Sequence, residues 1–178
     1  DLSIWGGDGV QYGVFIDGYE AEREVKNNVI ENNEIYNVNY IGINIVKEDA
    51  SDNIIRNNNI HDIGFYGIGI DRSPKNTITG NTISNLLGME GYSASDYCWG
   101  IILWGELADG NCITQQDVVD LPNGIILSSA HNTIVKNCNI SNCGYGLMVS
   151  KSSWAGGIPT GNIIMSNNIK GNAEGVYI

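Results

Sequence analysis

Asn53-Ile-Ile-Arg-Asn-Asn-Asn-Ile60, followed by Gly67-Ile-Gly-Ile70, is the stretch that decides the fold, because the chain repeats it. The copy before it reads Asn28-Val-Ile-Glu-Asn-Asn-Glu-Ile35 and then Gly42-Ile-Asn-Ile45. Further copies open at Asn76, Asn111, Asn132 and Asn162. A self-similar unit of this length is typical of a solenoid, in which each unit buries its apolar side against its neighbours.

Within each unit, apolar residues alternate over short stretches that Asn and Gly interrupt, which indicates three short strands joined by bends. Stacked units place like strands side by side in parallel, about 4.8 Å apart, and parallel crossovers are nearly always right-handed. The sequence therefore predicts an all-β, right-handed parallel β-helix of about seven coils. One side chain of each first strand is expected to face inward, and these side chains stack into a column in the core: Ile30, Ile55, Ile78, Ile113, Ile134 and Ile164. The third strands are expected to add Val14, Ile43, Ile68, Ile101, Ile125, Leu147 and Val176.

The repeated Asn residues are interpreted as structural. Asn tolerates left-handed backbone angles at bends, and its amide can bond to its own copy one coil away. Two such columns are predicted, of which one consists of the opening Asn of each copy. The other consists of Asn33, Asn58, Asn81, Gln116, Asn137 and Asn167.

Composition limits the classes of partner. The 178 residues suit one domain, residues 1–178, and nine Lys plus Arg against twenty Asp plus Glu give a net charge of −11. Such a balance argues against a nucleic-acid partner, because a protein binds phosphates through clustered cationic side chains. No apolar run approaches the ~20 residues of a membrane span. The chain opens at Asp1 in strand-like sequence, so it is expected to be processed from, or part of, a longer chain.

The repeats resemble the pectin-lyase-like β-helix superfamily over nearly the whole chain. They are most similar to the Asn-Gly-Ile repeats of surface and periplasmic β-helix proteins, such as those that assist nitrous oxide reductase maturation. The resemblance implies the fold and an extracellular, cell-surface or periplasmic location. It does not imply one activity, because lyases, hydrolases, epimerases, adhesins and phage spikes share this coil.

Catalytic motifs of the superfamily are absent from the sequence. The Asn-Thr-Asp, Asp-Asp, Gly-His-Gly and Arg-Ile-Lys motifs of polygalacturonase-type hydrolases do not occur, nor does the Asp-Pro-His-Glu of alginate epimerases. The best catalytic candidates are Asp71, Arg72 and Asp17, with Arg56 one strand away, as a metal ligand and a base that neutralises a substrate carboxylate. Turn chemistry also explains Asp71-Arg72. The chain is predicted not to be a catalyst, and the alternative is a lyase or epimerase acting on acidic polysaccharide.

Acidic residues gather in the long loops that follow the Gly-containing strands. Hard cations prefer several carboxylate and carbonyl oxygens. Calcium is therefore the one metal considered, with Asp17, Glu48, Asp49 and Asp71 as candidate ligands, and solubility is the other interpretation.

Aromatic residues recur just before the Gly of several copies: Tyr12, Tyr66, Trp99 and Tyr145, flanked by Tyr40 and Phe65. Aromatic rings on one edge of a coil suit stacking on sugar rings or contact with another protein. Stacking that only stabilises the turn is the alternative, and the sequence leaves both open.

The four cysteines lack a Cys-x-x-Cys pair, which disfavours zinc. They are expected to sit in the wall as small apolar residues. One disulfide is considered, in which the insertion from Met89 to Asp96 folds over the corner at Leu121-Pro122 and brings Cys98 to Cys143. Taken together, the sequence predicts an extracellular or cell-surface structural β-solenoid that associates end to end or contacts glycans, with calcium as the candidate cofactor.

Overall fold

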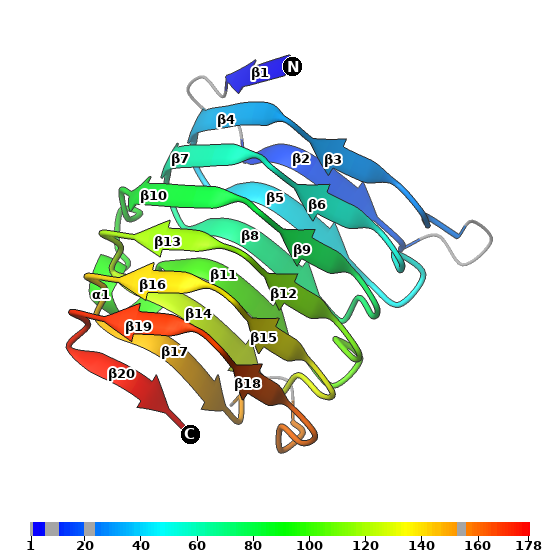
Figure 1. Cartoon of the computed structure of the whole chain (residues 1–178). Coiled ribbons are helices and arrows are strands. Elements are labelled where there is room, and N and C mark those ends of the chain that lie inside the picture. The colour runs from blue at the N-terminus through cyan, green and yellow to red at the C-terminus, as the bar shows by residue number, and fades with distance from the viewer. Residues whose placement is uncertain (1, 6–10, 20–23, 153–155) are drawn as a thin grey trace.

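In the part of the chain that the structure describes, twenty short strands, three to each complete turn, wind into a parallel β-solenoid (Figure 1). The computed structural model describes residues 2–5, 11–19, 24–152 and 156–178. Within them every strand pairs in parallel with the equivalent strand of a neighbouring coil. The chain makes six complete turns and two strands of a seventh, close to the expected seven coils.

The strands form three sheets, here named A, B and C. Sheet A contains β1 (Leu2–Trp5), β4 (Asn33–Val38), β7 (Asn59–Ile63), β10 (Thr82–Leu86), β13 (Asp117–Val119), β16 (Asn139–Ser141) and β19 (Asn168–Lys170). Sheet B contains β2 (Tyr12–Asp17), β5 (Ile41–Val46), β8 (Tyr66–Asp71), β11 (Trp99–Trp104), β14 (Asn123–Ser128), β17 (Tyr145–Ser150) and β20 (Glu174–Tyr177). Sheet C contains β3 (Val29–Glu31), β6 (Ile54–Arg56), β9 (Thr77–Thr79), β12 (Cys112–Thr114), β15 (Ile134–Lys136) and β18 (Ile163–Met165).

Aliphatic columns fill the interior, as the alternation predicts. The third-strand column is in register from Val14 through Ile68 to Val176, and its central members are fully buried. The first-strand column is confirmed from Ile30 to Ile113. Continuous columns of this kind remove one face of every strand from water and supply the main stabilisation of a solenoid.

One coil is displaced by a single residue from the prediction. Val135, and not Ile134, is the inward residue of β15 and pairs with Ile113, while Ile134 lies on the outer side. Because side chains alternate along a strand, a shift of one position exchanges the inner and outer sets. The prediction for Ile134 was wrong for this reason.

Asn ladders run along the bends as expected. The Asn28 backbone N–H donates to Asn53 Oδ1 at 3.0 Å, and the Asn53 N–H donates to Asn76 Oδ1 at 2.9 Å. A second ladder joins Asn33, Asn58 and Asn81 in the same way, each at 3.0 Å. Each ladder amide satisfies a backbone group that the bend would otherwise leave unpaired.

Because of the same one-residue shift, the prediction was wrong for two positions of the ladders. Thr133 and Cys138 occupy the ladder positions, and their backbone N–H groups donate to Asn162 and Asn167. Asn132 and Asn137, which were expected there, instead have φ of 48° and 55° at the residue before the ladder. Asn suits either role, so the residue type did not distinguish the two positions.

The proposed Cys98–Cys143 disulfide is absent. Both are free buried thiols, and Cys138 is also buried, which fits the expected wall positions. The insertion ends in α1 (Ala94–Tyr97) and is held by the Asn123 side chain, whose Nδ2 donates to the carbonyls of Ser95 at 2.8 Å and Cys98 at 3.0 Å. An amide, and not a sulfur bridge, therefore fixes this corner.

Candidate functional site

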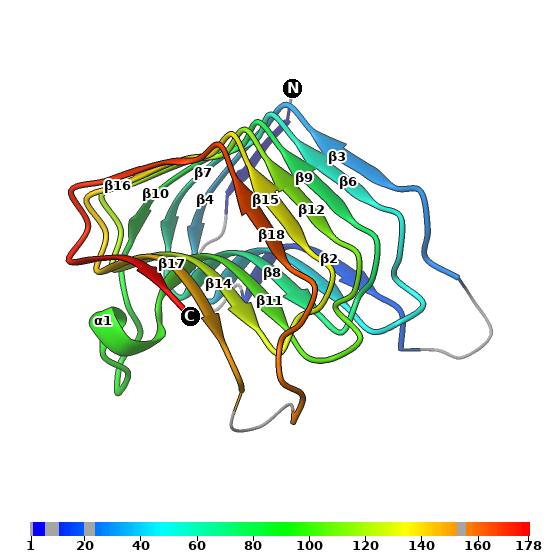
Figure 2. The same ribbon diagram turned by 60° about the horizontal axis from the view of Figure 1, so that its bottom comes forward.

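The outer face of sheet B carries more apolar side chains than a solvated face needs. Outward positions of its strands form columns that the pairing registers define, and one of them is strongly apolar. That column consists of Phe15, Asn44, Gly69, Ile102, Ile126, Met148 and Tyr177. The insertion with α1 projects beyond this face in Figure 2. Such a face, with a raised border, is suited to contact with another molecule.

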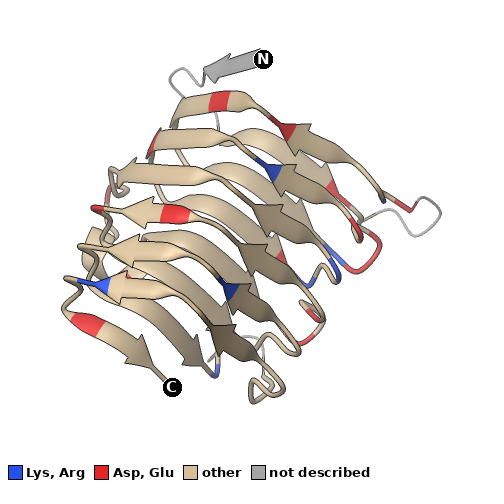
Figure 3. Ribbon diagram, in the orientation of Figure 1, with Lys and Arg blue, Asp and Glu red and all other residues tan. Residues whose placement is uncertain are grey.

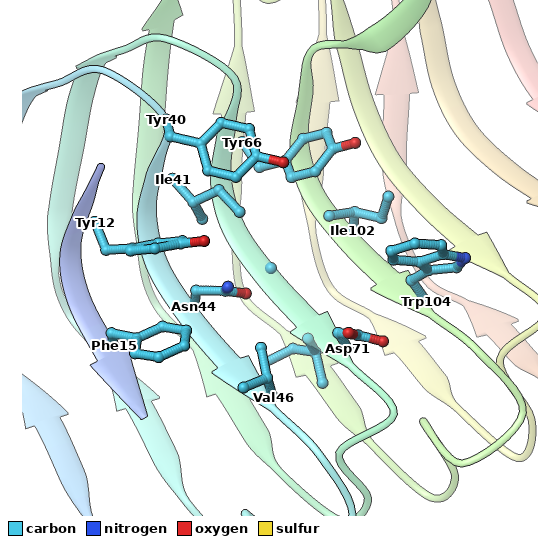
Figure 4. A pocket seen from close by; sticks show the side chains of 12 residues that line it. Tyr12, Phe15, Tyr40, Ile41, Asn44, Val46, Tyr66, Asp71, Ile102 and Trp104 are labelled. Carbon is cyan, nitrogen blue, oxygen red and sulfur yellow. The ribbon is translucent and has the colours of Figure 1, made fainter. Parts of the chain in front are cut away.

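A groove with a volume of about 220 Å³ lies on this face. Tyr12 and Phe15 of β2 form one wall, and Ile102 and Trp104 of β11 form the other, with Asn44 between them (Figure 4). Phe15 and Ile102 are three strand spacings apart, which corresponds to about 14 Å between their backbones. β5 and β8 lie between and form the floor.

The floor is low because of Gly69. A methyl group at this position would lie 2.8 Å from Asn44 Oδ1 and 3.6 Å from Ile41 Cγ2, so a side chain would occupy the space between the walls. The other outward residues of the floor are Ile41, Asn44 and Val46. A residue without a side chain in this one outward position therefore creates the depth of the groove.

The aromatic walls are supported by further rings. Tyr12 stacks on Phe15 with ring centroids 4.6 Å apart and meets Tyr40 edge-on at 5.8 Å. Tyr40 stacks on Phe65 at 5.3 Å, and Phe65 lies 4.2 Å from Tyr66. Phe15 and Trp104 remain 45% and 37% exposed, so they present ring surface to a ligand at low entropic cost.

At one end of the groove, Asp71 forms an ion pair with Arg72. Arg72 Nε and Nη2 donate to the two carboxylate oxygens of Asp71, each at 2.9 Å. This hydrogen bond raises the pKa of Arg72 above its usual value. Trp104 lies next to Asp71 in the sheet, and its indole N–H donates to Ser152 Oγ at 3.0 Å. Asp71 and Trp104 are thus held in fixed orientations at one end of the groove.

The other catalytic candidates do not join this pair. Asp17 shares a column with Asp71, but Val46 stands between them, so the two backbones are roughly 10 Å apart. Arg56 lies on sheet C, where it pairs with Glu31. A polysaccharide lyase needs a base with an accessible proton-accepting form, whereas the pairing with Asp71 keeps Arg72 protonated.

The calcium candidates are not gathered either. Glu48 and Asp49 lie beside Gly18, Tyr19 and Lys47 at the bend after β5, and neither lines the groove. Across the described ranges, no three His, Cys, Asp or Glu side chains come close enough together to hold a metal ion. The acidic loops are instead spread along the bends, as Figure 3 illustrates.

The predicted aromatic column is only partly available for contact. Tyr12 and Tyr66 line the groove, with Ile41 between them in the register. Trp99 is 6% exposed and stacks on Tyr145 with centroids 6.1 Å apart, so it stabilises the wall near α1. The column thus contains rings that line the groove and a buried ring that stabilises the wall, and contact with a glycan or another protein stays a prediction.

Sequence reasoning missed Phe15, Asn44, Gly69, Ile102 and Trp104. A signal existed in the third strands, where the residue between the two inward apolar positions should be polar on a solvated face. In several coils that residue is apolar, as in Ile125-Ile126-Leu127. The repeats were recognised from their inward residues alone, so this outward position was overlooked.

Two comparisons with known families bear on the chain. The family described as right handed beta helix region matches residues 9–102, and the family described as periplasmic copper-binding protein (NosD) matches residues 100–178. No curated protein matches. The periplasmic family agrees with the extracellular, cell-surface or periplasmic location expected from the sequence. In the parts of the chain that are described, no helix has the length and apolar character to cross a membrane.

The residues of the second match do not fit a copper centre. Burial raises the pKa of the Cys138 and Cys143 thiols, which keeps them in the protonated form, whereas the thiolate is the metal ligand. His131 Nδ1 is 3.0 Å from Thr160 Oγ1 and accepts the Thr160 backbone N–H at 3.2 Å. Within the described ranges no three His, Cys, Asp or Glu side chains gather, so the structure shows no copper site of that kind.

Proposed function

The chain belongs to the right-handed β-helix family, and from this premise we propose that it is a surface or periplasmic β-solenoid that binds glycans without transforming them. The observation that carries the proposal is the groove on sheet B, with exposed rings of Phe15 and Trp104 on opposite walls and polar groups of Asn44 and Asp71 between them. A sugar ring has apolar faces and a hydroxylated edge, which suits aromatic walls and a few fixed polar groups.

The size of the groove suits a single ring of a polymer. Its volume of about 220 Å³ is below the ~300 Å³ at which pockets for drug-sized ligands begin. The groove is open, so the rest of a glycan chain can continue along the face of the sheet. Contact with one or two sugar units is consistent with a scaffold that holds a polymer at many weak points.

Charge and pairing favour binding over catalysis. Arg72, which adjoins the groove residue Asp71, is already bound to it through Nε and Nη2, and no second carboxylate adjoins this pair in the register. A lyase or epimerase of acidic polysaccharide would need a free cation to neutralise the uronate and a base to take its proton. Ultraviolet absorbance during incubation with uronate polymers tests that alternative, since lyases form an absorbing unsaturated product.

Isothermal titration calorimetry with a panel of soluble neutral and acidic oligosaccharides tests the proposal. Loss of a stacking ring in Trp104→Ala should weaken binding about tenfold. Tyr36→Ala is the matched control, because this ring lies on the outer face of sheet A, stacked on His61. Equal weakening by both variants, or no binding to any member of the panel, would overturn the assignment.

End-to-end association of the chain stays a prediction from the sequence. Light scattering of the isolated chain over a range of concentrations measures it directly. A mass that does not rise with concentration would contradict it, without affecting the proposal for the groove.

A further inference from the structure

The floor of the groove contains a buried amide without a protein partner. Asn44 is 7% exposed, yet its side chain makes no hydrogen bond within the ranges that the structure describes. Its amide atoms are still reachable from the groove, since no fully buried side-chain nitrogen or oxygen of these ranges lacks a partner. Burying an amide without a partner costs free energy, so a retained Asn at this position points to a partner that arrives with a ligand.

The surroundings of Asn44 define what that partner is. Gly69 is the neighbour of Asn44 in the register and leaves a hollow beside the amide. Aliphatic side chains of Ile41 and Ile102 border the hollow. A group that fits must therefore be small, must combine a hydrogen-bond donor with an acceptor, and must carry an apolar tip.

We infer that the groove selects a neutral glycan bearing N-acetyl groups. The acetamido group has one N–H and one C=O, which the Asn44 side chain can satisfy with its own oxygen and nitrogen. Its methyl group would lie against the aliphatic border. The inference rests on the proposed function of the groove and adds the class of sugar.

Charge complementarity excludes an anionic glycan as the preferred ligand. The chain has a net charge of −11, and the bend next to the groove contains Glu48 and Asp49. The cation at the groove, Arg72, is engaged by Asp71. Lys47 lies at the same bend, over the Tyr19 ring and beside Glu48 and Asp49, so a uronate or sulfate would meet a surface on which carboxylates outnumber cations.

The test compares three tetrasaccharides by calorimetry: tetra-N-acetylchitotetraose, cellotetraose and tetragalacturonate. The first two share the backbone linkage and differ only in an acetamido group in place of a hydroxyl group. The ratio of their affinities therefore measures what the hollow beside Asn44 contributes to binding. A preference of about tenfold for the acetylated ligand is expected, the value of one or two net hydrogen bonds. Tetragalacturonate should bind least.

Two variants locate the preference. Gly69→Ala fills the hollow, and its new methyl group meets the movable end of Asn44, so the fold should tolerate it. Asn44→Leu keeps the volume and removes the amide. Both should reduce the preference for the acetylated ligand to less than about twofold, because each removes the contact that only this ligand makes, whatever its effect on the contacts shared with cellotetraose. Thermal melting of each variant checks that the fold persists.

The outcomes separate this inference from the proposed function. Equal affinity for the two neutral ligands, or a preference that survives in both variants, overturns the N-acetyl assignment and leaves glycan binding in place. Tightest binding of tetragalacturonate overturns it as well. Binding of none of the three removes the N-acetyl inference, and a negative result across the wider panel would remove the proposed function too.

Discussion

The outer faces of sheets A and B share the same coils and the same core, yet they differ in chemistry. On sheet A the outward polar groups satisfy one another: Asn139 donates to Asp117 at 2.7 Å, Asn168 donates to Asn139 at 3.0 Å, and His61 lies 3.4 Å from Glu34. On sheet B the equivalent outward positions include Ile102 and Asn44, whose side chain has no hydrogen-bond partner among the described residues.

The difference separates what the fold requires from what it permits. Inward columns and ladders are common to both faces and cannot change without loss of the solenoid. Outward positions of a strand are free to vary, so an apolar and unsatisfied outward set needs a reason beyond stability. We assign that reason to ligand binding. Substitutions in the core, in the Asn ladders and at the groove test which residues the fold requires.

The largest effect is expected from Ile68→Asp. Ile68 is fully buried in the column that both faces share, so the variant places an unpaired charge in a dry core and should cost several kcal/mol of unfolding free energy. Ser84→Asp, at an outward position of sheet A beside His61, should cost less than about 1 kcal/mol. Urea denaturation followed by circular dichroism measures both. A stable Ile68→Asp protein would contradict the assigned core.

A smaller loss is expected from Asn58→Ala. Its side chain accepts the Asn33 backbone N–H at 3.0 Å and donates to the Ile30 carbonyl at 3.0 Å, and both would be left unsatisfied. The cost should be about 2–3 kcal/mol. Asn59→Ala, the adjacent exposed residue, should change stability by less than about 0.5 kcal/mol. Similar values for the two would show that the ladder contributes little.

The sequence predicted the interior well and the exterior poorly, for a physical reason. Burial forces apolar side chains into a period of two, so Ile43, Ile68 and Ile101 were recognisable from spacing alone. Asn serves equally at a ladder position and at a left-handed bend, which is why Asn137 was misplaced by one residue. The groove depends on Gly69 and Asn44 meeting across two strands, and such a contact carries no local signature.

A modest gain is expected where the ladder is interrupted. Cys138 occupies a ladder position, and an Asn there could donate to the Ile113 carbonyl as Asn81 donates to that of Ile55 at 3.1 Å. Cys138→Asn should therefore stabilise the fold by about 1 kcal/mol. Cys138→Ala removes the thiol without adding an amide and serves as the control. No gain over Cys138→Ala would mean that the ladder is already complete without this side chain.

The smallest effect concerns alkaline pH and should arise on the groove side of the molecule. Burial, with smaller contributions from neighbouring ionisable groups, raises the pKa of Tyr66 well above its usual range and raises that of Tyr40 less. Both line the groove. A phenol with a raised pKa in the folded state holds its proton after the unfolded chain has lost it, so its stabilisation is complete below about pH 10 and declines as the pH rises towards the folded pKa. The melting temperature should thus fall between about pH 9 and 11, and it should fall less in Tyr66→Phe.

Trp104→Phe, which alters the groove but keeps both tyrosines, should retain the full decline. An identical decline in Tyr66→Phe would place the alkaline sensitivity elsewhere, such as the buried thiols of Cys98, Cys138 and Cys143, whose pKa values burial also raises.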